Sequence, residues 1–303
     1  MTEHTGRRVL ITGGTGFIGK ALIKRLLLAG DRITVLTRRP RQASTSLGGA
    51  VRCIETLARL SADEGFDVVV NLAGAPVVGP PWSKRRKSVL MHSRVGTTRA
   101  LIEWLGRTAH KPAVWIQASA IGVYGVRDPE EVLSEDSAVG SGFMSELCVA
   151  WEAAARAAVP LGVRQAVLRF GLVFGPGGSL PFMLMPYRLG LGGRLGSGRQ
   201  MLSWVHLDDV LAVIERAIDQ PEMTGVYNMV APQPVHQSDF AATAGRVLKR
   251  PTWLSLPAAP LRMLAGEMGQ LFLDGQRVMP TRLQREGYVF KHPTLEGTLR
   301  DLT

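Results

Sequence analysis

The sequence predicts an α/β protein with a doubly wound parallel sheet and a smaller, mostly helical C-terminal domain. Three observations lead to this fold class. Apolar runs alternate with stretches of helical periodicity up to about residue 230, as expected for parallel strands buried on both faces. A glycine-rich segment separates the first apolar run from the first helical stretch. Beyond residue 232, helical periodicity dominates.

The first strand is expected at residues 9–11, and the segment TGGTGFIG at residues 12–19 follows it. Gly13 permits the tight turn, Gly16 lets a pyrophosphate approach the backbone, and Gly19 lets the following helix pack closely. Free N–H groups and the helix dipole then favour phosphate binding. A glycine-rich turn without a ligand is the alternative, but the flanking strand and helix favour a Rossmann dinucleotide site. We expect cofactor contacts from Gly13, Thr15, Gly16, Phe17, Ile18 and Gly19.

The remaining elements follow from apolar periodicity between turn signals. Strands are expected at residues 9–11, 33–37, 51–54, 67–72, 113–118, 163–170 and 225–230, and long helices at residues 83–107, 143–158 and 208–219. Residues 171–198 are rich in Gly and Pro and mark a change of character. We therefore predict a dinucleotide-binding Rossmann domain from residues 1–170 and 206–231. A smaller substrate-side and C-terminal domain takes residues 171–205 and 232–303.

The composition is that of an ordinary folded protein. Of the 303 residues, 46% are hydrophobic and 20% are charged. No apolar run approaches the ~18 residues of a transmembrane helix, and residues 1–8 lack the apolar core of a signal peptide. Cys53 and Cys148 form no CxxC motif. We expect a cytoplasmic protein with free thiols, no metal site and no membrane partner.

The net charge of +11 raises the question of nucleic-acid binding. The basic residues are scattered, however, and the densest cluster is at residues 83–87. No aromatic side chains interleave with it as stacking platforms. The pattern argues against nucleic acid as the main partner and favours a solvated surface, with a few arginines at a phosphate site.

Several motifs stand in a fixed order along the chain, at residues 12–19, 71–75, 93–97, 119–125, 147–152, 168–171 and 203–209, and together they resemble one known family. The chain is similar to the extended short-chain dehydrogenase/reductases, in particular to their atypical NAD-dependent epimerase/dehydratase-like branch called epimerase family proteins. Some members of this branch are described as cell-division inhibitors. The resemblance covers nearly the full length, and residues 266–290 resemble a small C-terminal domain peculiar to the branch.

The end of the second expected strand predicts NADP rather than NAD. NAD-binding folds usually place an acidic residue here to accept from the ribose 2′-OH, but residues 33–52 contain no Asp or Glu. Arg38 instead offers a planar fork suited to a 2′-phosphate. The alternative is that Arg38 and Arg39 are solvated loop residues. The resemblance further implies cofactor contacts from Leu72, Ala73, Gly74 and Arg94.

The catalytic pair of the superfamily is missing. Its Tyr and Lys are spaced YxxxK, so that both lie on one helix face and the Lys lowers the pKa of the Tyr. The residues four positions after Tyr124, Tyr187, Tyr227 and Tyr288 are Asp128, Leu191, Ala231 and His292. In the helix that should carry the pair, the two positions fall on Met144 and Cys148, or one residue earlier on Phe143 and Leu147. Neither choice supplies an acid, a base or a cation.

Ser119 and Tyr124 are the remaining catalytic candidates. Ser119 matches the family's Ser/Thr region, although a gapless alignment puts Ala120 at the usual hydroxyl position, and a Ser bonded to backbone is an equal alternative. Tyr124 follows a strand at the switch point of the sheet, where such folds bind ligands. His206 is either a base or, more often in such a context, the cap of the following helix.

Two functions follow from this pattern. The first is an NADP-dependent oxidoreductase or sugar-nucleotide epimerase-like enzyme with non-standard catalytic residues and an unidentified small-molecule substrate. The second is an NADP-binding regulatory protein that has lost the chemistry, for example one acting in cell division. In extended family members, helices at the positions of residues 83–107 and 143–158 pair across dimers, so we also expect a homodimer.

Overall fold

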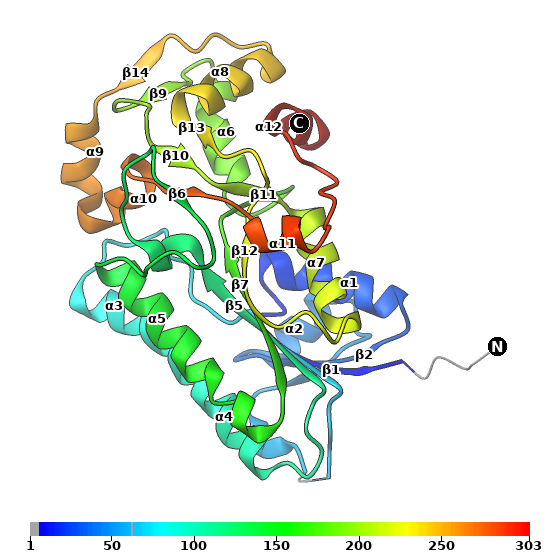
Figure 1. Ribbon diagram of the computed structural model, residues 1–303. Helices are drawn as coiled ribbons and strands as arrows, with labels where there is room; N and C mark the ends of the chain where they lie inside the picture. Colours follow the sequence, from blue (N-terminus) through cyan, green and yellow to red (C-terminus); the bar gives the residue numbers. More distant parts are fainter. Residues whose placement is uncertain (1–5, 62) are drawn as a thin grey trace.

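Figure 1 shows the computed structural model, which describes residues 6–61 and 63–303. Most of the N-terminal segment used in the signal-peptide argument, residues 1–5, lies outside the described residues. Within the described ranges, every helix is too short or too polar to span a bilayer.

The central element is a seven-stranded sheet in the order β12-β7-β5-β4-β1-β2-β3, with every neighbouring pair parallel. Its strands are β1 (Arg8–Thr12), β2 (Arg32–Leu36), β3 (Arg52–Ile54), β4 (Val68–Asn71), β5 (Val114–Ala120), β7 (Arg164–Phe170) and β12 (Gly225–Met229). The expected strands are confirmed, with ends shifted by a residue or two. Chain order reverses between β1 and β4, and open sheets of this kind bind ligands at the C-terminal strand ends beside such a reversal.

Helices cover both faces of this sheet (Figure 1). The alternation of side chains along β1 assigns the faces, because successive residues point to opposite sides. Val9 and Ile11 pack with α1 (Phe17–Leu28) and α7 (Leu207–Asp219). Leu10 packs with α4 (Thr97–Arg107) on the other face, where α5 (Phe143–Arg156) lies against α4 and β5. The doubly wound class is therefore confirmed.

The helix expected at residues 83–107 is interrupted by a wider turn. It consists of α3 (Lys84–Met91), a π-helical segment η2 (His92–Gly96) and α4. Such π turns are rare and often occur at functional sites, because the extra residue redirects the side chains that follow. Here the wider turn contains Arg94, one of the expected cofactor contacts.

A second apolar core lies beyond the C-terminal ends of the strands. Phe174 stacks on Trp204 with ring centroids 5.7 Å apart, and Phe240 packs against Phe174. The residues of this core come from 174–204 and 231–299. The division at residues 170 and 206 stays a prediction, as does the dimer surface on the helices around α4 and α5.

Most of the other elements are short. The helices are α2 (Pro40–Ser46), α6 (Leu180–Arg188), α8 (Gln237–Leu248), α9 (Ala258–Ala265), α10 (Gln270–Leu273), α11 (Thr281–Arg285) and α12 (Leu295–Leu302). Two-stranded parallel pairs are β6 (Val132–Leu133) with β15 (Arg277–Val278), β8 (Leu172–Phe174) with β11 (Trp204–His206), and β9 (Gly193–Leu195) with β14 (Leu254–Leu256). The antiparallel pair is β10 (Met201–Leu202) with β13 (Val235–His236). Single-turn 3₁₀ segments are η1 (Leu57–Arg59), η3 (Ile121–Tyr124), η4 (Val159–Leu161) and η5 (Gly266–Gly269).

Candidate cofactor site

The glycine-rich turn between β1 and α1 is folded so tightly that side chains would not fit. Gly13 has a φ of +70°, and a Cβ atom there would lie 2.4 Å from the carbonyl oxygen of Leu72. A Cβ atom on Gly19 would lie 2.3 Å from the carbonyl oxygen of Gly13. These two glycines therefore bring the turn, the helix and the end of β4 into contact.

The N-terminus of α1 is suited to a pyrophosphate. Its N-cap residue, Gly16, has no side chain to accept from the free N–H groups, and the first turn contains no acidic residue. Thr15 and Gly16 are exposed at this point. Uncapped N–H groups and the positive helix end form an anion-binding site. Ile18 follows in the first turn of α1, so its backbone N–H belongs to the same group.

The ring of Phe17 is enclosed by a second glycine-rich segment. Cβ atoms added to Gly175, Gly177 or Gly178 would lie 2.6–2.9 Å from ring atoms of Phe17. These glycines belong to the Gly- and Pro-rich stretch at residues 171–198. Their role is steric, since they let the loop after β8 pack over Phe17 beside the glycine-rich turn between β1 and α1.

Arg38 lies at the end of β2 and is exposed. Its guanidinium makes no hydrogen bond or ion pair with any residue that the structure describes. The neighbouring Arg39 reaches the Oε1 of Gln42 at 3.4 Å. The end of β2 therefore presents a free cation and no carboxylate, which fits a 2′-phosphate better than a ribose hydroxyl.

The end of β4 is fixed by a buried hydrogen-bond network. The amide of Asn71 accepts from Thr12 Oγ1 at 2.6 Å and donates to Thr98 Oγ1 at 2.8 Å. The N–H of Ala73 donates to Thr12 Oγ1 at 3.2 Å. This network holds Leu72, Ala73 and Gly74 beside the glycine-rich turn, and their cofactor contacts stay a prediction.

Arg94 is the most informative residue of the site. Its guanidinium lies beside Gly74, where an added Cβ would be 2.9 Å from Arg94 Cζ. The residue is 9% exposed, and its charge lies over the ring of Trp151 at 5.2 Å. Its Nη1 donates a long hydrogen bond to the carbonyl oxygen of Leu90 at 3.4 Å. Burial lowers the pKa of this guanidinium, and no described carboxylate pairs with it. A buried cation of this kind fits an anionic ligand.

Ser119 is placed at the C-terminal end of β5, but its hydroxyl is occupied. Its Oγ donates to Glu152 Oε1 at 2.6 Å. Arg169 binds both carboxylate oxygens of Glu152 at 2.9 Å, and both side chains are buried. Glu152 lies in the motif at residues 147–152, and its place on the sheet-facing side of a helix is the signal that indicates a buried polar partner.

Tyr124 is fully buried. Its OH donates to Asn228 Oδ1 at 2.7 Å and accepts from Arg169 Nη1 at 3.0 Å. Burial raises the pKa of this phenol, with Arg169 acting in the opposite direction. Substrate contact would require one of these partners to move. The catalytic roles of Ser119 and Tyr124 therefore stay predictions.

The two positions of the missing Tyr–Lys pair carry apolar contacts. Met144 packs among the side chains of Trp82 and Leu147. Cys148 is buried, and burial raises the pKa of its thiol to about 12, so the thiolate is absent at neutral pH. The helix that normally supplies the proton donor supplies packing here.

His206 caps a helix rather than acting as a base. Its Nδ1 accepts from the backbone N–H of Asp208 at 3.0 Å, at the start of α7. His206, His292 and Asp301 have ligand atoms within 4.8 Å of one another. However, a neutral ring whose Nδ1 accepts carries its proton on Nε2, which leaves that nitrogen no lone pair for a metal ion.

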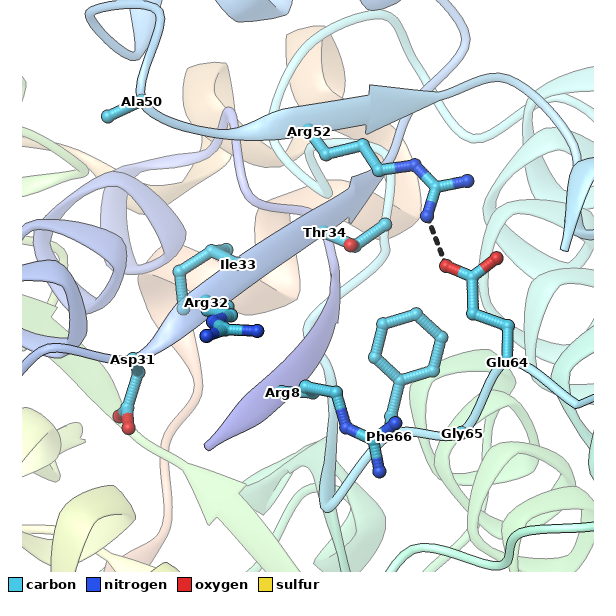
Figure 2. A pocket seen from close by; sticks show the side chains of 10 residues that line it. All are labelled: Arg8, Asp31, Arg32, Ile33, Thr34, Ala50, Arg52, Glu64, Gly65 and Phe66. Carbon is cyan, nitrogen blue, oxygen red and sulfur yellow. Dashed lines mark hydrogen bonds and ion pairs between the residues drawn. The ribbon is translucent and has the colours of Figure 1, made fainter. Parts of the chain in front are cut away.

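A separate cavity of about 390 Å³ lies at the N-terminal ends of the strands, opposite the glycine-rich turn (Figure 2). Arg8, Arg32 and Arg52 line it from the first residues of β1, β2 and β3. Arg52 pairs with Glu64, and Arg8 pairs with Asp67 just outside the lining, so most of the cationic charge is already neutralised. Open α/β sheets bind cofactors at the C-terminal ends of their strands, on the other side of the molecule from this cavity.

The comparison with known proteins agrees with this geometry. The model of the NAD dependent epimerase/dehydratase family matches residues 9–230. The chain belongs to this family. A second model, the domain of unknown function DUF1731, matches residues 256–302 of this epimerase-family chain. The resemblance inferred from the motifs, including the branch-specific C-terminal domain, is therefore confirmed.

Relatives match over the full length. The chain is 37% identical to epimerase family protein SSP1921 of Staphylococcus saprophyticus, covering 98% of this chain and 99% of the relative. It is 36% identical to epimerase family protein SDR39U1 of Mus musculus, covering 97% and 99%. The crystal structure of human SDR39U1 (isoform 2) with NADPH aligns with a TM-score of 0.86 at 34% identity, covering 97% and 98%.

Proposed function

We propose that this chain binds NADP(H) in the crevice at the C-terminal ends of β1 and β4. The observation that carries the proposal is Arg94, a buried guanidinium that faces the cofactor path at Gly74 and has no carboxylate partner in the described part of the chain. A ligand phosphate or ribose would supply the missing acceptors. The human relative was crystallised with NADPH, which supports the same ligand here.

In this proposal, the two ends of the cofactor are held by different cations. The N-terminus of α1 binds the pyrophosphate, and Arg38 binds the 2′-phosphate. Arg94 takes the place of the missing lysine and holds the half of the cofactor that carries the nicotinamide. Its rigid fork offers several donors where a lysine offers one point charge.

Bound NADP(H) would supply or accept a hydride, but the described residues offer no ordinary proton donor at the positions of the family's Tyr–Lys pair. Met144 and Cys148 cannot exchange a proton, and the Tyr124 hydroxyl is tied to Asn228 and Arg169. General acid–base groups contribute roughly 10²–10⁴-fold each. We therefore infer that epimerisation of sugar nucleotides by the usual Tyr–Lys route is absent or very slow, which favours an NADP-binding regulatory role.

An oxidoreductase with non-standard residues is the second candidate. Ser119 favours it, because its hydroxyl lies at the C-terminal end of β5 and is oriented by Glu152. Substrates of such sheets bind at these strand ends. Turnover of the bound cofactor with a panel of metabolites, followed by the change in absorbance of its reduced nicotinamide ring, separates the two candidates. Turnover that falls in Ser119→Ala would favour the oxidoreductase.

Cofactor selectivity tests the binding proposal. Calorimetric titration should show NADPH binding more tightly than NADH, because only NADPH carries the 2′-phosphate. Arg38→Ala should weaken NADPH binding by roughly 10- to 150-fold, since a hydrogen bond to a charged group contributes about 1.5–3 kcal/mol. NADH affinity should not change. Arg39→Ala is the matched control, because Arg39 is equally exposed. Equal affinities for the two cofactors in the unmodified protein would overturn the assignment of Arg38.

A further inference from the structure

The outer face of α6 is apolar and uncovered. Phe182, Met185 and Leu189 follow one another at spacings of three and four residues, and they are 75%, 55% and 67% exposed. The opposite face of the helix, which carries Leu184 and Tyr187, is buried in the second core. α6 is therefore apolar on two faces, of which this chain covers one. Clustered exposure of large apolar side chains usually marks an interaction site.

This face continues onto β14. The parallel register pairs Leu254 with Gly193, which places Trp253 beside Gly192. A Cβ atom on Gly192 would lie 2.1 Å from the ring of Tyr187, so the residue beside Trp253 also lies against the last turn of α6. Trp253 is 72% exposed. Figure 1 shows β9 and β14 side by side, away from the central sheet. We call the surface formed by Phe182, Met185, Leu189, Leu191 and Trp253 the α6–β14 face.

The two stretches of chain that form the α6–β14 face carry basic side chains and no acidic ones. Residues 153–207 and 240–266 contain no Asp or Glu. Arg188, Arg194, Lys249 and Arg250 are exposed, and none of them pairs with a carboxylate of the described residues. Arg194 lies opposite Ser255 in the register, on the exposed side of the strand pair. An occupant of this face must therefore bring negative charge together with apolar side chains.

The free edge of β14 decides between the acidic occupants. Among the described residues, β14 pairs with β9 alone, so its other edge keeps unpaired backbone groups. A lipid bilayer would remove water from these groups without replacing it. A second copy of the chain would bring two sets of like charges together. An extended peptide satisfies the backbone groups by adding a strand.

We propose that the α6–β14 face binds an acidic protein segment with interleaved apolar residues, which adds as a strand to the free edge of β14. Its backbone pairs with β14, its apolar side chains cover Trp253 and Leu189, and its carboxylates meet Arg188 and Arg194. This surface lies apart from the cofactor crevice and does not depend on it.

The test uses a fluorescein-labelled peptide of alternating Glu and Leu, with a peptide of alternating Lys and Leu as its control. Fluorescence anisotropy should show binding of the Glu peptide only, weakening as salt is added because charges at the rim are screened. Trp253→Ser and Arg194→Glu should each weaken binding at least about tenfold, which corresponds to ~1.4 kcal/mol. Leu28→Ser and Arg107→Glu are matched controls, since both residues are exposed on other elements. These controls should leave peptide binding unchanged.

Four results would overturn the proposal. They are equal binding of the two peptides, absence of binding to either peptide, unchanged binding in Trp253→Ser, and a preference for phosphatidylserine vesicles over the Glu peptide. A dimer in analytical ultracentrifugation that Trp253→Ser dissociates would assign the face to a second copy instead. NADPH titration of each variant is measured in parallel. It shows that the variant is folded, and it keeps failure of this proposal separate from failure of the cofactor proposal.

Discussion

Replacement of Arg94 by Met should move stability and cofactor affinity in opposite directions. Met has a similar length and keeps the contact with Trp151, but it removes the charge. Replacing buried charges by apolar side chains of similar volume is often neutral or stabilising by about 1–4 kcal/mol. The lost cation–π contact, about 0.5–2 kcal/mol, is partly recovered by the sulfur–aromatic contact of Met, about 0.3–1.5 kcal/mol.

The free energy of unfolding without cofactor should therefore stay unchanged or rise by about 1–2 kcal/mol. The hydrogen bond to Leu90 contributes little at 3.4 Å. NADPH affinity should fall by roughly 10- to 150-fold, because charge-assisted hydrogen bonds of about 1.5–3 kcal/mol are lost. Urea denaturation measures the first quantity and calorimetric titration the second. Arg99→Met is the control, since Arg99 is exposed on α4, which directly follows the segment that contains Arg94.

A loss of stability in Arg94→Met with unchanged NADPH affinity would refute this reasoning. That result would mean that the guanidinium is a structural cation satisfied within the fold. Equal losses in Arg94→Met and in Arg99→Met would likewise show that burial beside Gly74 has no special role.

Three further predictions concern the turn, the buried ion pair and pH. Gly19→Ala should weaken NADPH binding at least about tenfold, because its Cβ meets the Gly13 carbonyl oxygen at 2.3 Å. Gly106→Ala is the control, since a Cβ atom there points into open space and should stabilise the fold by about 0.4–1 kcal/mol. Equal calorimetric affinities of the Gly19→Ala variant and the unmodified protein for NADPH would contradict this. Arg169→Met should cost about 3–5 kcal/mol in urea denaturation, because Glu152 is left buried and unpaired; a loss below about 1 kcal/mol would disprove it. Burial and the neighbouring His292 lower the pKa of His206, so the unfolded chain binds a proton at a higher pH than the folded chain does. Thermal stability should therefore fall as the pH drops below about 6.5, the pKa of His206 in the unfolded chain. His206→Asn should flatten this dependence of stability on pH.

The local pattern of the sequence predicted most of the Rossmann sheet. The apolar run before Gly13 and the helical periodicity after Gly19 both follow from residues close together in the chain, and their elements formed where expected. The missing Tyr–Lys pair was also readable, because its spacing within one helix is local. The π turn at Arg94 was not readable, because its wider hydrogen-bonding pattern is set by packing on the sheet and has no composition of its own.

The sequence by itself determined the fold class, the glycine-rich turn between β1 and α1, and the absence of an acidic residue after β2. Each of these depends on a few neighbouring residues, whose backbone preferences and charges do not change with the tertiary structure. Only the tertiary structure decided that Ser119 and Arg169 share the carboxylate of Glu152, and that Tyr124 is closed off by Asn228. It also brought Gly74 and Arg94 together beside Trp151. These contacts join separate elements, so they arise from the way the sheet and helices pack. Packing then determines which buried polar groups are left without a hydrogen-bond partner and can bind a ligand.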